Sequence, residues 1–341
     1  MDSEGLLGIY EVGKFLGEGA FGKVAKCSKL GSNECFAIKM VDDMDAGMDE
    51  AKAIGLIKSL DPDVNNLLKF HESFKYLKFM CLVYEILDQS LESLMRKNSF
   101  RPTHLCAIRA IAQQLLVALS ALKSINVFHG DIKLDNIMMV NQDSTPYKVK
   151  LIDFGLATDS WDLQLGALVQ IVPFRAPQVS LGLPLGVGAD MWSLGVVLAS
   201  LYFGKLPFTY DEEYDTIRCV VQWFGLPEDE PLFEGLFTSE FFTFEKDCSK
   251  PGWRFNSPSE YTQKSGEAVR RLNTIPDLDQ MKEILGFLES GFVTSNPHPS
   301  PQLHHQLLET FPPFLEVGPV SLCLLLWQHK MPYCPLKGAS W

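Results

Sequence analysis

The segment from His129 to Gly155 constrains this chain more than any other. It reads H-G-D-I-K-L-D-N-I-M-M-V, then the polar turn N-Q-D-S-T-P-Y, then K-V-K-L-I-D-F-G. Two alternating apolar runs, Asn136–Val140 and Tyr147–Ile152, are typical of short strands on either side of a turn. The pattern predicts a hairpin whose polar residues, just before the first strand and just after the second, meet at one end.

Four of these residues predict a chemistry. Oxygen ligands for Mg²⁺ beside a carboxylate that can activate a hydroxyl are what phosphoryl transfer from a nucleotide requires. We expect Asp131 to orient and deprotonate the hydroxyl and Lys133 to neutralise charge on the phosphoryl group. Asn136 and Asp153 would hold Mg²⁺. His129 follows two apolar residues, which favours a buried histidine that orients the backbone over a proton carrier.

A glycine-rich stretch near the N-terminus predicts a phosphate cradle. Strand-like Ile9–Phe15 leads into G-E-G-A-F-G-K-V, with glycines at Gly17, Gly19 and Gly22. Glycines let the backbone turn sharply and approach phosphates closely. A strand rather than a helix follows them, which disfavours a dinucleotide-binding turn. Val24 would then lie over the nucleotide base, although a plain glycine-rich hairpin stays an alternative for this motif alone.

The next apolar strand, Cys35–Met40, contains a lysine. Lys39 is costly in such a strand unless it is paired, and a ligand phosphate plus a carboxylate would pair it. The following segment, 49–60, has apolar residues at helical spacing: Ala53, Ile54, Ile57 and Leu60. Glu50 lies one turn before Ile54, on the same face. We expect Glu50 to pair with Lys39. Asp49 is the alternative partner, and Glu50 as a solvated charge is the alternative role.

Two further strands are predicted at Leu67–Phe74 and Phe79–Tyr84, which would complete a five-stranded antiparallel sheet. The chain then leaves the sheet through a short connector. The backbone groups of Glu85 and Leu87 would face the edge of an adenine. Helices follow at Ser90–Lys97, at 103–125, which is apolar on most sides, and at Met191–Tyr202.

Composition limits the classes of partner. The 341 residues, 46% hydrophobic and 21% charged, suit one large two-lobed domain or two small ones. A net charge of −12 argues against nucleic acid or an anionic membrane as the main partner. Eight cysteines without a C-x-x-C pair, and an N-terminus without a leader pattern, predict reduced thiols in an intracellular protein. Nucleus and cytoplasm are both open, as is the oligomeric state.

The chain resembles the eukaryotic protein kinases, because G-x-G-x-x-G-x-V, A-I-K, H-x-D-x-K-x-x-N and D-F-G occur in order. The segments C-L-V-Y-E-I-L-D-Q-S-L, F-R-A-P, D-M-W-S-L-G and W-R-F-N-S-P-S-E-Y resemble the homeodomain-interacting protein kinases. The resemblance covers roughly 9–290. It implies an α+β bilobal fold with a small antiparallel N-lobe (9–84) and a mainly helical C-lobe (85–290), followed by a divergent Pro/His-rich tail (291–341).

The resemblance also implies an activity and its ligands. Lysine two residues past the base is typical of the serine/threonine class, which transfers the γ-phosphoryl group of ATP, with Mg²⁺, to protein hydroxyls. Leu16 and Ala37 would join the residues that contact the nucleotide. Arg175 resembles the residue that shapes the pocket after the target hydroxyl, so proline-directed sites are a family expectation.

Three departures from the family pattern stand out. Leu168 stands at the family's activation-loop tyrosine, and we expect this segment to be packed by its own apolar residues: Leu163, Leu165, Leu168, Val169, Ile171 and Val172. Gln178 replaces the glutamate of A-P-E, and the family's last helices are missing after about Leu288. A kinase-shaped scaffold or binding protein with weak catalysis is therefore the alternative function.

Overall fold

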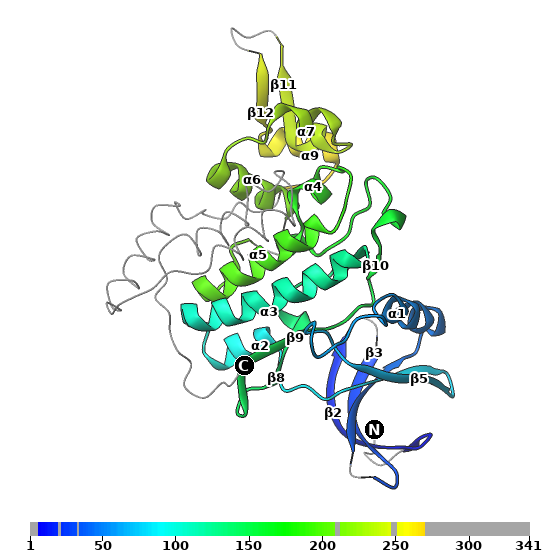
Figure 1. The fold of residues 1–341 in the computed structure, drawn as a ribbon. Helices are drawn as coiled ribbons and strands as arrows, with labels where there is room; N and C mark the ends of the chain where they lie inside the picture. Colours follow the sequence, from blue (N-terminus) through cyan, green and yellow to red (C-terminus); the bar gives the residue numbers. More distant parts are fainter. Residues whose placement is uncertain (1–5, 20–21, 33, 209–211, 247–250, 270–341) are drawn as a thin grey trace, which may run out of the picture. The chain divides into compact units, whose positions relative to one another are not determined.

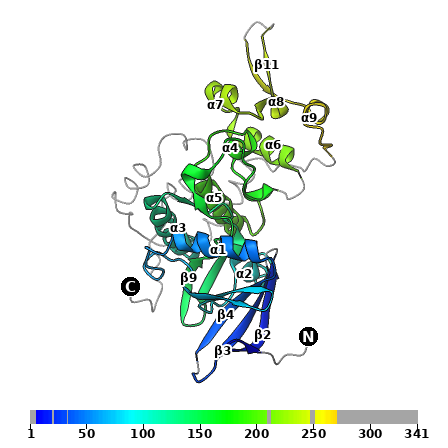
Figure 2. The ribbon, with the colours of Figure 1, turned by 90° about the vertical axis from the view of Figure 1, so that its right-hand side faces the viewer.

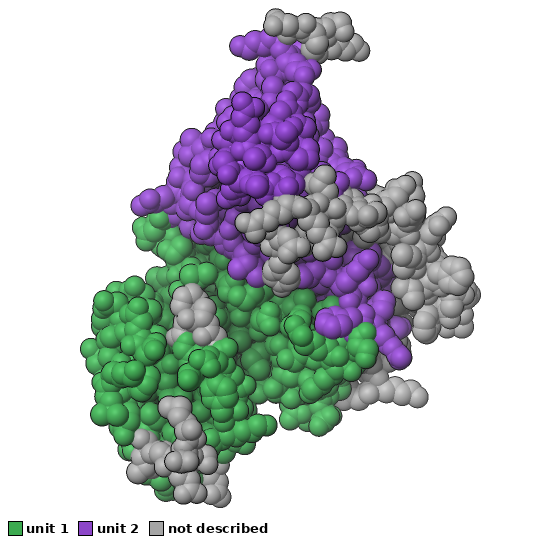
Figure 3. Space-filling model, turned by 180° about the vertical axis from the view of Figure 1, so that it is seen from behind, with its two compact units in different colours: residues 1–99, 109–162 green, residues 100–108, 163–341 purple. Residues whose placement is uncertain are grey.

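The computed structural model describes residues 6–19, 22–32, 34–208, 212–246 and 251–269. The chain divides into two compact units, shown in different colours in Figure 3. Unit 1 comprises residues 1–99 and 109–162, and unit 2 comprises 100–108 and 163–341. Unit 1 thus reaches beyond residue 84, where the N-lobe is expected to end, and includes the hairpin predicted within residues 129–155. The predicted tail 291–341 lies outside the described residues.

An antiparallel sheet forms the first part of unit 1 (Figure 1). Its strand order is β1-β2-β3-β4-β6-β5. The bounds are Leu6–Leu7 (β1), Tyr10–Gly19 (β2), Gly22–Lys29 (β3), Cys35–Val41 (β4), Phe70–Tyr76 (β5) and Phe79–Tyr84 (β6). The five expected strands are all present. The two-residue β1 adds an edge strand that its short apolar sequence did not reveal.

One face of this sheet packs in an apolar core, and the other face carries Lys39. Alternate residues of a strand point to opposite faces, and the buried residues Ala25, Cys27, Ile38, Cys81 and Val83 gather with Tyr10 in one apolar core. The intervening positions share the other face, because Lys39 pairs with Val24 on one side and with Leu82 on the other. Core packing on one face therefore fixes which side chains reach the site on the other.

Helix α1 (Met44–Leu56) lies beside this sheet (Figures 1 and 2). It begins before the predicted segment because Asp43 caps it, accepting hydrogen bonds from the backbone N–H groups of Asp45 and Ala46 at 3.0 and 3.2 Å. It ends at Leu56. The periodic Leu60 thus lies outside the helix, in a turn where its N–H donates to Ile57 O.

The rest of unit 1 carries the predicted hairpin. Strands β8 (Ile137–Asn141) and β9 (Thr145–Leu151) pair with Ile137 opposite Leu151, and the 3-10 turn η1 (Leu134–Asn136) precedes them. Helix α2 spans Leu91–Lys97, and β7 (Val127–Phe128) pairs with β10 (Thr158–Asp159) ahead of η2 (Ser160–Asp162).

Helix α3 (Leu105–Ser124) starts in unit 2 and continues in unit 1. Of the helices in the described residues, it alone is long and apolar enough to cross a membrane. More than half of its apolar window (56%) is buried inside the protein, as expected for a core helix. Its length and composition are therefore weak evidence for a membrane span.

Unit 2 is mainly helical. Its elements are η3 (Val172–Phe174), α4 (Pro177–Ser180), α5 (Gly188–Phe203), α6 (Glu213–Phe224), α7 (Asp229–Glu234), α8 (Thr238–Phe241), β11 (Phe242–Glu245), β12 (Gly252–Phe255) and α9 (Pro258–Ser265). An apolar cluster that includes Tyr214, Phe241 and Tyr261 joins α6, α8 and α9.

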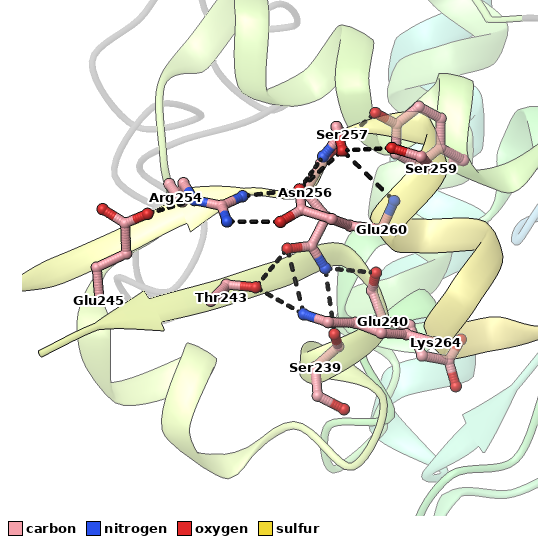
Figure 4. Close-up of polar contacts among 11 residues, drawn as sticks. Ser239, Glu240, Thr243, Glu245, Arg254, Asn256, Ser257, Ser259, Glu260 and Lys264 are labelled. Carbon is pink, nitrogen blue, oxygen red and sulfur yellow. Dashed lines mark hydrogen bonds and ion pairs between the residues drawn. The ribbon is translucent and has the colours of Figure 1, made fainter.

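Asn256 is the polar centre of this part of unit 2 (Figure 4). The buried amide donates to the backbone carbonyls of Ser239 and Glu240 at 3.2 and 2.7 Å. Its oxygen accepts from the Thr243 hydroxyl at 2.6 Å, and its backbone carbonyl accepts from Tyr214 at 2.7 Å. Asn256 thereby connects β11, β12, α8 and α6 through one side chain and its backbone.

The activation segment does not pack as expected. None of its six apolar residues is buried, and the exposed fractions of Leu165 and Leu168 are 56% and 61%. The prediction of a segment packed by its own apolar residues was wrong. The backbone contacts explain why: Arg175 and Gln170 bind the carbonyls and amides of this segment, so polar bonds rather than leucine packing hold it.

Candidate active site

Lys39 is the centre of the first group of site residues, all within unit 1. Strand β4 directs its side chain away from the apolar core, and α1 supplies the carboxylate of Glu50. The ammonium Nζ lies 2.9 and 2.7 Å from the two oxygens of Glu50, and 3.2 Å from Oδ1 of Asp153. The expected pair of Lys39 and Glu50 is present. Asp49 instead pairs with Lys52 on the exposed side of α1.

The electrostatics of this group favour a charged lysine. Burial alone would lower the pKa of Lys39, but the carboxylates of Asp153 and Glu50 outweigh burial and raise it above its usual value. Burial also raises the pKa of Glu50, against the opposing effect of Lys39. Two nearby carboxylates therefore keep an ammonium charged in a place where burial would otherwise disfavour it.

Asp153 lies at the end of the hairpin in a strained backbone conformation. Its φ is +63°, which is uncommon for a residue with a side chain. The following Phe154 is buried, and its ring packs edge-on against His129 with centroids 4.9 Å apart. The buried ring fixes the backbone that turns Asp153 toward Lys39.

Asp131, Lys133 and Asn136 form the second group, also in unit 1. Oδ2 of Asp131 accepts hydrogen bonds from Nζ of Lys133 and from Nδ2 of Asn136, both at 2.7 Å. Nδ2 of Asn136 also donates to the backbone carbonyl of Asp131 at 2.9 Å. Asn136 O accepts from Ile152 N at 2.9 Å, which joins this group to the end of strand β9 that leads to Asp153.

His129 orients the backbone, as expected. The ring is fully buried; Nδ1 accepts from the Asp131 N–H at 3.2 Å, and Nε2 lies 3.1 Å from Ile152 O. A neutral ring with its proton on Nε2 satisfies both partners. Burial lowers the pKa of His129, against the opposing charges of Asp131 and Asp153. The ring therefore links the segment before Asp131 to the segment before Asp153.

The residues predicted to contact a nucleotide lie on strands β2, β3 and β4 and in the connector after β6. Val24 and Ala37 lie on the same face of the sheet as Lys39. Gly22 has a φ of +144°, and a Cβ there would lie 2.4 Å from Met40 O, so the turn requires glycine. A Cβ on Gly17 would meet nothing within 4 Å, and Gly19 pairs with Gly22 at the end of the β2–β3 hairpin. Leu16, also on β2, is 46% exposed.

The connector after β6 is anchored by a lysine that sequence patterns did not single out. Lys150 is 3% exposed, and its Nζ lies 2.6 Å from Asp63 Oδ1 and 2.7 Å from Glu85 Oε1. The Glu85 N–H donates to Lys69 O at 3.1 Å. Leu87 is buried. The sequence signal that could have revealed this role is the position of Lys150 between the apolar residues Val149 and Leu151 of β9.

The oxygen donors near Lys39 and Asp131 limit which metal ion this part of unit 1 could hold. Among the described residues, no group of three or more His, Cys, Asp or Glu side chains could hold one. Magnesium differs from zinc in this respect, because it commonly takes one or two protein ligands plus phosphates and water. The Asp153 carboxylate and Oδ1 of Asn136, whose Nδ2 is engaged with Asp131, fit that demand.

In unit 2, Arg175 organises the backbone of the activation segment. Its guanidinium donates to the carbonyls of Val169 and Gln170 at 3.0 and 2.9 Å, and Nη1 lies 2.9 Å from Oε1 of Glu213. Gln170 has a φ of +63°. Its side chain bonds Ala176 N at 3.0 Å. The carbonyl of Gln170 is thus held by Arg175 instead of facing outward.

Comparisons with known proteins agree with this geometry. The family model described as the protein kinase domain matches residues 10–248. Homeodomain-interacting protein kinase 2 of Mesocricetus auratus is 38% identical over 261 residues, which is 75% of this chain and 22% of that protein. Homeodomain-interacting protein kinase 1 of Caenorhabditis elegans is 38% identical, with coverage of 80% and 34%. The human homeodomain-interacting protein kinase 4 is 33% identical, with coverage of 81% and 46%.

The chain therefore spans less than half the length of these curated relatives. Among solved structures, the crystal structure of the kinase domain of PF14_0431 superimposes with a TM-score of 0.64 at 28% identity, covering 69% of this chain and 76% of that one. The expected fold class, a small antiparallel sheet followed by helices, is confirmed. The chain belongs to the protein kinase family, and its sequence relatives place it among the homeodomain-interacting protein kinases.

Proposed function

We propose that this chain is an ATP-dependent serine/threonine protein kinase. One observation carries the proposal: unit 1 holds a charged lysine between two carboxylates, and beside Asn136 it holds a carboxylate bound by a second lysine. Transfer of a phosphoryl group needs little covalent help from the protein. It needs positioning and charge stabilisation, and these side chains supply both.

Each residue has a task in this scheme. Lys39, held by Glu50 and Asp153, would pair with phosphate oxygens of ATP. Asp131 would accept the proton of the substrate hydroxyl, with its carboxylate oriented by Asn136. Lys133 would offer its ammonium to the transferred group, since it is tied to Asp131 at 2.7 Å and is only partly buried.

Asn136 and Asp153 are the residues that would hold Mg²⁺, on the donor chemistry given above. A divalent ion there would neutralise phosphate charge as it develops. Until then, the Asp153 carboxylate shares the ammonium of Lys39. The ion pair therefore holds the Asp153 carboxylate where it would meet the metal ion. The same ion pair holds the Lys39 ammonium where it would meet the phosphates.

The contacts of Arg175 support a preference for proline after the target hydroxyl. A peptide residue at this place brings a backbone N–H that needs an acceptor. The guanidinium of Arg175 already occupies the carbonyl of Gln170, with Nε at 3.3 Å and Nη2 at 2.9 Å. Proline has no N–H and loses nothing there, whereas another residue would leave a donor unsatisfied.

A transfer assay with Mg-ATP and paired peptides tests both parts of the proposal. We expect a Ser-Pro peptide to be labelled at least about tenfold faster than its Ser-Ala counterpart. Asp131→Asn should lower labelling by about a hundredfold or more. Asp135→Asn, which removes an exposed carboxylate from the same turn, should leave labelling unchanged.

The outcomes separate the candidate functions. Equal labelling by Asp131→Asn would point to a contaminating enzyme and contradict the proposal. Tight binding of Mg-ATP without labelling by the wild-type chain would favour the kinase-shaped binding protein. Equal rates with the two peptides would contradict the preference for proline and leave the transfer activity standing.

A further inference from the structure

The hydroxyl of Tyr84 lies within the lysine site. Tyr84 ends β6, and its hydroxyl donates a hydrogen bond to Oε1 of Glu50 at 3.0 Å. Nζ of Lys39 lies 2.9 Å from the same oxygen. Both Tyr84 and Glu50 are buried, with exposed fractions of 7% and 3%. One buried carboxylate oxygen therefore accepts from a phenol and from an ammonium.

The sheet register explains how two neighbouring strands reach one carboxylate. Tyr84 pairs with Ala37, and Lys39 pairs with Leu82, so all four point to the same face. On that face Lys39 and Tyr84 approach Glu50 of α1 from adjacent strands. Because both strands are internal to the sheet, the two donors have little freedom. The ammonium of Lys39 and the hydroxyl of Tyr84 therefore fix the position of the Glu50 carboxylate on α1.

The charges around Lys39 make that position sensitive. The ammonium lies 3.2 Å from Oδ1 of Asp153 and 2.7 Å from Oε2 of Glu50. A buried carboxylate is costly unless its oxygens are satisfied. Burial raises the pKa of Tyr84 well above its usual value, so the phenol keeps its proton. Without this donor, Oε1 of Glu50 loses one of its bonds, and both the carboxylate and the ammonium that it binds are held less firmly in place.

We propose that Tyr84 is a positioning residue for Lys39. Its hydroxyl fixes Glu50, and Glu50 fixes the ammonium at the place where phosphate oxygens would bind. The inference rests on the proposed function, because ATP is what the ammonium would meet. It predicts an effect on the phosphates and none on the nucleoside, since the hydroxyl contacts Glu50 rather than the base.

Binding of Mg-ATP and of adenosine to the full chain, measured by calorimetry, tests the proposal. In Tyr84→Phe the dissociation constant for Mg-ATP should rise about tenfold, the scale of one hydrogen bond to a charged group. The constant for adenosine should stay within about twofold of wild type. The matched control is Tyr10→Phe, which removes another hydrogen bond from a buried tyrosine to a glutamate, Glu72, on the opposite face of the same sheet. It should change neither constant.

Three results would overturn the inference. One is an unchanged affinity of Tyr84→Phe for Mg-ATP. Another is an equal loss for Mg-ATP and adenosine, which would make Tyr84 a wall of the nucleotide pocket. The last is the same loss in Tyr10→Phe, which would indicate a general effect on the sheet. A wild-type chain that binds no Mg-ATP would overturn the proposed function together with the inference.

Discussion

At the scale of single residues, the site is built from charges that would be unfavourable if they were alone. Lys39, Glu50, Asp131 and Lys150 are buried or nearly so, and each is held by a partner of opposite charge. Removing one member of such a pair is expected to cost about 3–5 kcal/mol, because the other is left buried and uncompensated. An intact pair adds little net stability, because burying its charges costs about as much as their attraction gains. Its main effect is to fix the positions of the charged side chains.

His129 gives a pH dependence of stability that this geometry predicts. In the folded chain the ring accepts from Asp131 N, so a second proton would break that bond. Burial lowers its pKa below the usual 6.5, so near that pH the unfolded chain binds more protons than the folded chain. Stability should therefore fall as pH drops below about 6.5, by at most about 1.4 kcal/mol per pH unit, and level off below the folded pKa.

Urea unfolding between pH 7.5 and 5 measures this dependence. His129→Gln should be less stable at pH 7.5, and its unfolding free energy should change less with pH than that of wild type. His71→Gln, in which an exposed ring is replaced, should keep the wild-type slope. A wild-type slope in His129→Gln would mean that other groups cause the acid sensitivity.

At the scale of elements, α1 determines where Glu50 lies, and one glycine lets α1 come close to the sheet. A Cβ on Gly47 would lie 2.5 Å from Cβ and 2.9 Å from Cγ of Met80 on β6. The same helix contains Gly55, where a Cβ would meet nothing within 4 Å. The two glycines therefore separate close packing from helix propensity within one element.

Gly47→Ala should push α1 away from β6, cost about 1–3 kcal/mol of stability and lower transfer activity through Glu50. Gly55→Ala should stabilise the helix by about 0.5–1 kcal/mol and leave activity unchanged. Thermal unfolding and the peptide assay measure both effects. If Gly47→Ala matched Gly55→Ala in both measurements, the position of α1 would not depend on this contact.

Strands and helices could be predicted from the sequence where residues close together in the chain determine them. The strands β4 and β6 and the hairpin of β8 and β9 could be predicted from alternating apolar residues, and the pairing of Lys39 with Glu50 could be predicted too. The hydroxyl of Tyr84 and the buried Lys150 could not, because their roles depend on partners brought together by the register of the sheet. The activation-segment leucines misled for a related reason, since backbone contacts of Arg175 hold that segment.

At the scale of the whole molecule, the described chain separates its tasks between two units. The residues proposed to bind nucleotide and metal lie in unit 1, and Arg175 with its partners lies in unit 2. Asn256 stabilises unit 2 through hydrogen bonds within that unit. Its amide satisfies the carbonyls of Ser239 and Glu240 in a place that is only 1% exposed.

This separation predicts which amides respond to which change. Asn256→Ala removes the buried amide that donates to the carbonyls of Ser239 and Glu240, and each lost hydrogen bond is worth about 0.5–1.5 kcal/mol. Hydrogen exchange should then become faster in α8, β11, β12 and α9, and stay at the wild-type rate in β4, α1 and β6. Mg-ATP should do the opposite by slowing exchange in β4, α1 and β6. Faster exchange in β4 and α1 of Asn256→Ala would contradict the prediction, because it would mean that the two units open as one cooperative structure.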